Sequence, residues 1–139
     1  MAEFPAPAEG LLITYLVVSG DVERSRRFYA DVLGGETVAD GDEFAIVAIA
    51  NGWVTITSAG EPTPDKPAVT LEPPTDLGRV SGFLNIRVAN VAVAYDQWRE
   101  RGANFLTPPI NRGREIRCYM RDPDGHLIEV GQVIPGDGA

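Results

Sequence analysis

Apolar and polar residues along this chain follow a pattern of strand, helix and three strands that occurs twice. In the first copy, residues 11–19 are rich in apolar and β-branched side chains and predict a strand. Residues 22–33 space their apolar side chains as one face of a helix, between a capping Asp21 and the stop signal Gly34. Three further apolar runs predict strands at residues 36–39, 44–50 and 53–58.

The second half of the chain repeats this order. A strand is predicted at residues 83–88, followed by Asn90 as a helix cap, a helix over residues 91–101 and Gly102 as its stop. Strands are then predicted at residues 104–107, 115–121 and 126–133. The repeating unit is βαβββ, with a spacing of about 70 residues.

The repeat predicts an α+β fold in one domain. Residues 11–59 form a first βαβββ module and residues 82–133 a second, and together they are expected to build one curved mixed sheet with a cleft. Between them, residues 60–81 form a proline-rich connector. Residues 1–10 are expected to be a loose arm.

Charge and rare residues limit the function. The formal net charge of −8 argues against nucleic acid or an anionic membrane as a partner, because both require a basic surface. Cys118 and His126 are the only residues of their kinds, so one chain has neither a disulfide nor a metal site with two histidines. No membrane-spanning run or signal-peptide layout is present, and we expect a cytoplasmic protein.

A carboxylate in an apolar strand is the first candidate for chemistry. Residues 121–125 predict a tight turn, in which Pro123 presets one backbone angle and Gly125 accepts a positive φ. Residues 127–130 of the strand that follows are apolar except for Glu129. A carboxylate at such a position either faces water or acts inside a cavity.

Three segments of the chain carry a resemblance to a known family. They are residues 20–34 with the first helix, residues 88–91 at the start of the second helix, and residues 122–129 with the Asp-Pro-Asp-Gly turn. The pattern resembles the vicinal oxygen chelate superfamily, which includes glyoxalase I, bleomycin-resistance proteins and extradiol dioxygenases. The resemblance implies the fold of that superfamily, but not one particular activity.

Metal-dependent members of this superfamily place ligands at four strand positions. Matched to this sequence, those positions fall on Thr14, Ile56, Phe83 and Glu129, and only Glu129 is a metal ligand. The chain therefore resembles the metal-less, bleomycin-resistance type. A divalent metal bound through Glu129 stays open as the alternative.

Strand alternation predicts which side chains accompany Glu129 in a cleft. Tyr119 aligns with a tyrosine that lies beside the metal in extradiol dioxygenases, and Arg117 shares its face by parity. The other predicted ligand-binding residues are Asn85, Arg87 and Phe83 in the second module and Thr14, Phe44, Ile46 and Ile56 in the first. An alternative for Glu129 is a structural ion pair with Arg117 or Arg87, and for Tyr119 a packed core aromatic.

These residues favour a protein that binds a small antibiotic or metabolite without a metal, since an apolar wall facing a few polar groups is typical of ligand sites. By resemblance, binding takes place at the cleft of a homodimer. The alternative is a lyase, isomerase or dioxygenase that uses Glu129 as base or metal ligand and Tyr119 as proton donor. A structural or regulatory module that pairs with another protein is the third reading, and no motif supports it.

Overall fold

The computed structural model describes residues 9–136 and divides into two compact units, Met1–Pro74 and Thr75–Ala139. Each unit holds one of the predicted repeats, and the boundary falls inside the predicted connector. The loose arm expected at residues 1–10 lies outside the described residues except for its last two positions. The strands hydrogen-bond as two sheets, one in each unit, rather than as one continuous sheet.

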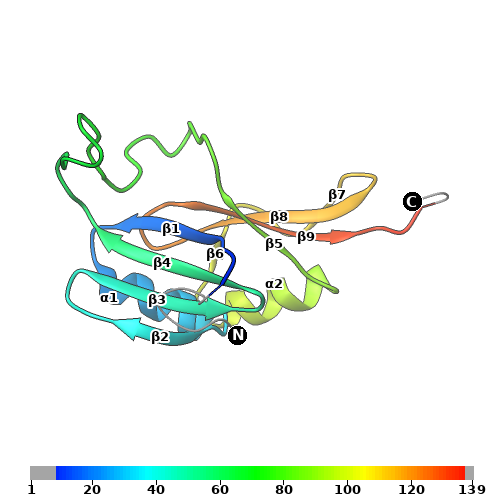
Figure 1. The fold of residues 1–139 in the computed structure, drawn as a ribbon. Helices are drawn as coiled ribbons and strands as arrows, with labels where there is room; N and C mark the ends of the chain where they lie inside the picture. The colour runs from blue at the N-terminus through cyan, green and yellow to red at the C-terminus, as the bar shows by residue number, and fades with distance from the viewer. Residues whose placement is uncertain (1–8, 137–139) are drawn as a thin grey trace. The chain divides into compact units, whose positions relative to one another are not determined.

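The first unit is a four-stranded mixed sheet with one helical segment. Its elements are β1 (Thr14–Ser19), α1 (Val22–Arg27), the π-helix η1 (Phe28–Val32), β2 (Glu36–Asp40), β3 (Phe44–Ile49) and β4 (Gly52–Ser58). The strand order is β1-β4-β3-β2, with β1 parallel to β4 and the other neighbours antiparallel (Figure 1).

The first helix begins where the sequence predicts and changes type halfway. The Asp21 side chain accepts a hydrogen bond of 3.1 Å from the amide of Arg24, which confirms the predicted cap. From Phe28 onward the helix widens, because the amide of Leu33 bonds the carbonyl of Phe28 five residues earlier. Gly34 ends the segment with a φ of 79°.

The core of the first unit lies between α1 and the sheet. The helix packs on β3 and β4, and the side chains of Val17, Val47 and Ile56 are buried there beside Tyr29. These residues fix which face of the sheet is covered, because directly paired residues on neighbouring strands point to the same face.

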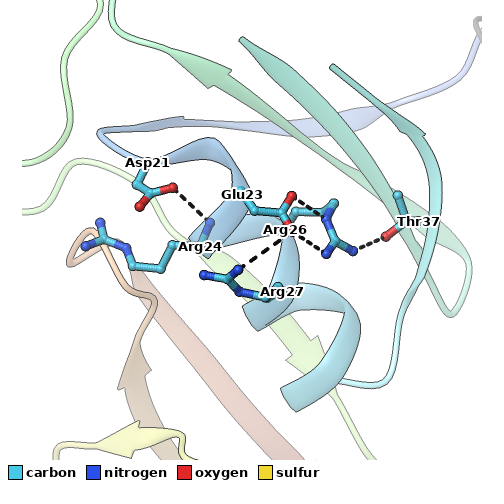
Figure 2. A network of polar contacts seen from close by, with 6 residues as sticks. All are labelled: Asp21, Glu23, Arg24, Arg26, Arg27 and Thr37. Carbon is cyan, nitrogen blue, oxygen red and sulfur yellow. Dashed lines mark hydrogen bonds and ion pairs between the residues drawn. The ribbon is translucent and has the colours of Figure 1, made fainter. Parts of the chain in front are cut away.

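Arginines on α1 join that helix to the sheet edge (Figure 2). The Arg26 guanidinium donates two hydrogen bonds to Glu23, at 2.6 and 2.9 Å, and a third of 2.9 Å to the hydroxyl of Thr37 on β2. Hydrogen bonds from Arg26 hold the pKa of Glu23 below its ordinary value. This cluster contributes to structure, as the sequence pattern of a solvated helix face suggests.

The second unit repeats the first in order and direction. Its elements are β5 (Leu84–Arg87), α2 (Val91–Glu100), β6 (Asn104–Phe105), β7 (Ile110–Asn111), β8 (Glu115–Arg121) and β9 (Leu127–Val133). The strand order is β5-β9-β8-β6, and β5 is parallel to β9 as β1 is to β4 (Figure 1). The α+β class and the predicted repeat are therefore confirmed.

One face of the second sheet is buried and the other is open. Cys118 and Met120 of β8 pair with Val130 and Ile128 of β9, and all four side chains are at most 1% exposed.

Asn90 caps α2 as predicted, by accepting a hydrogen bond of 3.1 Å from the amide of Val93. Short β7, which pairs with β8, has no apolar run of its own and was not predicted. None of the described helices has the length and apolar character needed to cross a membrane.

Candidate functional site

The turn between β8 and β9 sets the register of the candidate site. The buried carboxylate of Asp122 accepts hydrogen bonds from the amides of Asp124 and His126, at 3.0 and 2.9 Å, and Gly125 adopts a φ of 99°. The closed turn places Arg121 opposite Leu127, so that Tyr119 lies opposite Glu129. The motif singled out in the sequence thus positions two candidate residues.

Arg121 fastens this turn to the start of the unit. Its guanidinium donates hydrogen bonds to the carbonyls of Gly125 and Leu77, at 3.0 and 2.8 Å. The Leu77 side chain lies over Gly125 so closely that a Cβ there would come within 2.6 Å of it. Gly125 is therefore favoured by its positive φ, and a Cβ there would also require the Leu77 side chain to move.

Glu129 receives donors from both neighbouring strands. Its side chain is 9% exposed. The Tyr119 hydroxyl donates to Oε2 at 2.6 Å, and the Asn85 amide donates to Oε1. The Arg87 guanidinium lies 3.6 Å from Oε1. Asn85 and Arg87, placed on this face by strand parity, and Tyr119, placed there by the family resemblance, all contact Glu129 in the structure.

Tyr119 lies between the carboxylate and an aromatic ring. The hydrogen bond to Glu129, reinforced by burial, raises the pKa of the Tyr119 phenol above its ordinary value, because the bond requires the proton. The Phe83 ring meets the Tyr119 ring edge to face, with centroids 5.8 Å apart. Tyr119 is accordingly a hydrogen-bond donor to Glu129 with an aromatic surface beside it.

Glu115 belongs to this site and was missed in the sequence. It lies 3.6 Å from Arg87 and 3.5 Å from Arg117, so it joins the two arginines. The missed signal was alternation, since Glu115, Arg117 and Tyr119 are spaced by two along β8 and share one face. The four charged residues Arg87, Arg117, Glu115 and Glu129 form a cluster with balanced charge.

Gly131 makes room for this cluster. It pairs with Arg87 on one side and Arg117 on the other. A Cβ at this position would collide with Nη1 of Arg87 and lie 2.9 Å from its Cζ. The Arg87 guanidinium thus lies across the backbone of β9, which lets it reach both glutamates.

The described residues around Glu129 do not group as a metal centre. Among residues 9–136, no three His, Cys, Asp or Glu side chains are grouped so as to hold a metal ion. Phe83 has no donor atom, and each oxygen of Glu129 already accepts a hydrogen bond. Independence from metal stays a prediction.

The predicted position of Ile56 in the site is wrong. Ile56 pairs with Val17 and Ala45, lies on the covered face of the first sheet and is 0% exposed. The prediction treats the turns Asn51-Gly52 and Asp124-Gly125 as equivalent, which puts Ile56 and Glu129 each four residues beyond a glycine. In the structure Gly52 is already paired in β4, whereas Gly125 lies inside the five residues that separate Arg121 from Leu127, so a count from the glycines is one residue out. A one-residue slip moves every side chain to the opposite face.

Register identifies Thr55 as the first-unit counterpart of Glu129. Leu16 lies five residues before the helix cap Asp21, as Asn85 lies five residues before the cap Asn90. Thr55 pairs with Leu16 and Ile46 as Glu129 pairs with Asn85 and Tyr119. Threonine at this position also departs from the carboxylate or histidine of metal-dependent members. The correction therefore leaves Glu129 as the one matching ligand position.

The other first-unit candidates do share the open face. Thr14 is exposed, and Phe44 is 42% exposed with its ring against the backbone of Gly41. Ile46 is 7% exposed, because it packs in a small cluster with Ala48 and Trp53. This face is apolar, as predicted, and part of it is already covered within the unit.

Comparisons with known proteins agree with this fold. A model of the Glyoxalase/Bleomycin resistance protein/Dioxygenase superfamily matches residues 12–130. A lactoylglutathione lyase of Salmonella typhimurium is 29% identical over 126 residues, which cover 86% of this chain and 90% of the relative.

Two solved structures show the same architecture. A glyoxalase/bleomycin resistance protein/dioxygenase from Nocardioides matches with a TM-score of 0.73 and 20% identity, over 95% of this chain and 89% of that one. TnmS3, an antibiotic binding protein from Streptomyces sp. CB03234, matches with a TM-score of 0.66 and 22% identity, over 91% and 98% of the two chains. The chain belongs to the Glyoxalase/Bleomycin resistance protein/Dioxygenase superfamily.

Proposed function

We propose that this member of the superfamily binds an organic small molecule on the open face of its second sheet, without a metal ion at Glu129. The observation that carries the proposal is the state of Glu129. Each of its oxygens accepts a hydrogen bond from a neighbour on the same face, so both oxygens are engaged in orienting polar side chains of this chain.

The surroundings of Glu129 support a ligand of aromatic or amphipathic character. Phe83 is 39% exposed and extends the aromatic surface of Tyr119, while Asn85 and the arginines offer polar atoms beside it. A few convergent polar groups beside an aromatic surface are typical of small-molecule sites. The antibiotic-binding neighbour supports the same class of ligand.

A binding screen tests this function. Aromatic antibiotics and metabolites are screened by thermal shift, and the hits are measured by calorimetry against the variants Phe83→Ala and Tyr119→Ala. We expect about a tenfold or larger loss of affinity in both variants, because each removes an aromatic contact. Val93→Ala, at an exposed apolar residue of α2, is the matched control and retains affinity. Hits that bind both aromatic variants as tightly as the wild type would place the ligand elsewhere and refute the proposal.

Metal content is measured on the same preparation. We expect ligand binding to be unchanged after dialysis against a chelator, and Glu129→Gln to leave the metal content unaltered. Close to one equivalent of Ni²⁺, Zn²⁺ or Fe²⁺ per chain, lost in Glu129→Gln, would show that Glu129 is a metal ligand after all.

A second candidate function is catalysis, which the Tyr119–Glu129 pair favours. A phenol whose pKa is raised remains protonated at neutral pH and suits a proton donor, and a carboxylate beside it suits a general base once one donor moves away. The lactoylglutathione lyase relatives suggest one reaction to assay, with and without added divalent metal. Turnover that falls about 100-fold or more in both Tyr119→Phe and Glu129→Gln would establish an enzyme. Activity equal to that of the buffer, in both conditions, would exclude this lyase reaction.

The homodimer implied by the family resemblance is also part of the proposal. Sedimentation at micromolar concentration is expected to give twice the chain mass of 15.0 kDa. A monomer that still binds ligand would separate binding from assembly.

A further inference from the structure

We propose that the ligand of this face is an organic anion, whose carboxylate is held by Arg117 and Arg87 while its aromatic body rests on Phe83 and Tyr119. The inference rests on the proposed binding function and names the chemistry of its ligand. Three observations carry it: the exposure of the charged side chains, the N···O distances of their ion pairs, and the aromatic pair beside them.

The positive charges of the four-residue cluster lie outermost. The side chains of Arg87 and Arg117 are 40% and 36% exposed, whereas those of Glu115 and Glu129 are 25% and 9% exposed. A molecule that approaches from solvent therefore meets two guanidinium groups before it meets either carboxylate. The cluster is neutral as a whole, but its surface is cationic.

The arginines retain their hydrogen-bonding capacity. Their ion pairs with Glu115 and Glu129 span 3.5–3.6 Å, longer than the 2.7–3.2 Å of good N–H···O bonds. Within residues 9–136, neither guanidinium of this pair donates a hydrogen bond to a protein atom. Each presents a fork of N–H donors that matches a carboxylate bidentately.

The glutamates hold the arginines in place and add little repulsion. Glu129 is occupied by Tyr119 and Asn85, and Glu115 lies between the two guanidiniums. Gly131 sits between Arg87 and Arg117 in the sheet, so no side chain separates them. An anion on this surface would meet the partly exposed guanidinium groups of both arginines.

The aromatic pair sets where the rest of the ligand lies. Phe83 and Tyr119 are in edge-to-face contact, and the Arg117 guanidinium is 5.9 Å from the Tyr119 ring centroid. A carboxylate at Arg117 therefore brings an attached aromatic body next to these rings. An aryl or arylalkyl carboxylate fits both halves of the surface.

Three probes that differ in charge test the inference: 2-naphthoate, 2-naphthamide and 2-naphthylmethylammonium. Calorimetry at low and high salt is expected to show naphthoate binding about tenfold or more tightly than the neutral amide, with a preference that shrinks as salt rises. In Arg117→Gln the preference for naphthoate is expected to disappear, while Arg99→Gln, at an exposed arginine of α2, keeps it. Thermal melts confirm that both variants are folded.

The outcomes separate the two proposals. Equal binding of naphthoate and naphthamide, or a preference for the ammonium probe, overturns the anion inference and leaves small-molecule binding intact. The same holds if the protein binds a neutral compound of the screening panel through Phe83 but binds none of the three probes. Naphthoate preference that survives in Arg117→Gln also overturns the inference, because the anion is then held elsewhere. Binding of no compound of any charge counts against both.

Discussion

The open faces of the two sheets share a backbone plan and differ in what their side chains do. The central row of the second sheet is Asn85, Glu129 and Tyr119, joined by hydrogen bonds, and its counterpart in the first sheet is Leu16, Thr55 and Ile46. Ordering, strand direction and register are the same in both. Chemistry in this fold is therefore decided by few side chains on a repeated scaffold.

The next row shows the same contrast. Arg87, Gly131 and Arg117 occupy it in the second sheet, whereas Val18, Thr57 and Phe44 occupy it in the first. The first face is apolar, and part of it is buried because Ile46, Ala48 and Trp53 pack together. The second leaves Asn85 exposed and Arg87 and Arg117 partly exposed above a buried Glu129, which is an arrangement that suits a ligand with a polar end.

The largest effect is expected from comparing Ile56, on the covered face of the first sheet, with Thr55 on its open face. Ile56→Ala should destabilise the protein by about 2–5 kcal/mol, because it leaves a cavity under the helix. Thr55→Ala, one residue away and on the open face, should cost less than about 1 kcal/mol. Urea denaturation of both variants measures the difference. Equal losses would show that Thr55 and Ile56 are not on opposite faces.

The next largest effect is expected at Glu129, the middle residue of the central row in the second sheet, compared with Thr55 in the first. Glu129→Ala removes the acceptor of Asn85 and Tyr119 and should cost about 1–2 kcal/mol, with the loss limited because Asn85 can turn to water. Thr55→Ala serves here as the matched variant in the first sheet. Glu129→Gln, which keeps an acceptor oxygen, should recover part of the loss. A Glu129→Ala variant as stable as the wild type would mean that the network makes no net contribution.

Local signals in the sequence predicted much of this fold. Asp21 and Asn90 cap helices because their side-chain oxygens reach amides three residues on, an interaction that is settled within one turn. The second hairpin was equally local, since Asp122 and Gly125 close it by themselves. The positions of Tyr119 and Asn85 beside Glu129 came from the family resemblance and from strand parity, respectively.

What the sequence did not predict depends on partners that are distant along the chain. The first hairpin places the positive φ on Ala50 rather than on Gly52, so the Asn51-Gly52 turn was predicted at the wrong residues, and with it the face of Ile56. The path of Arg87 over Gly131 depends on space across two strands, which no local pattern reveals. The π-helical turn after Phe28 likewise lacks a propensity signal.

A smaller effect on stability is expected at Gly131, and its sign depends on whether Arg87 is present. Gly131→Ala should displace the Arg87 guanidinium, and the loss of exposed ion pairs should cost at most about 1 kcal/mol. In an Arg87→Ala background the same change should become neutral or stabilising, because alanine is favoured over glycine in a strand. A double-mutant cycle by urea denaturation measures this coupling. Strict additivity would show that Arg87 does not need the space.

The smallest effect appears only at high pH, and it concerns Tyr119. Its pKa is raised in the fold by the hydrogen bond to Glu129, so the neutral phenol is the form that the fold favours. The resulting stability is fully present below the unfolded phenol pKa of about 10 and is lost as pH rises through the raised folded value. In the first sheet, the counterpart Ile46 has no such group. Wild-type protein should therefore lose stability above about pH 10 more steeply than Tyr119→Phe, and difference absorbance titration should show the Tyr119 pKa falling in Glu129→Gln. Identical pH profiles for wild type and Tyr119→Phe would mean that Glu129 does not hold the phenol proton.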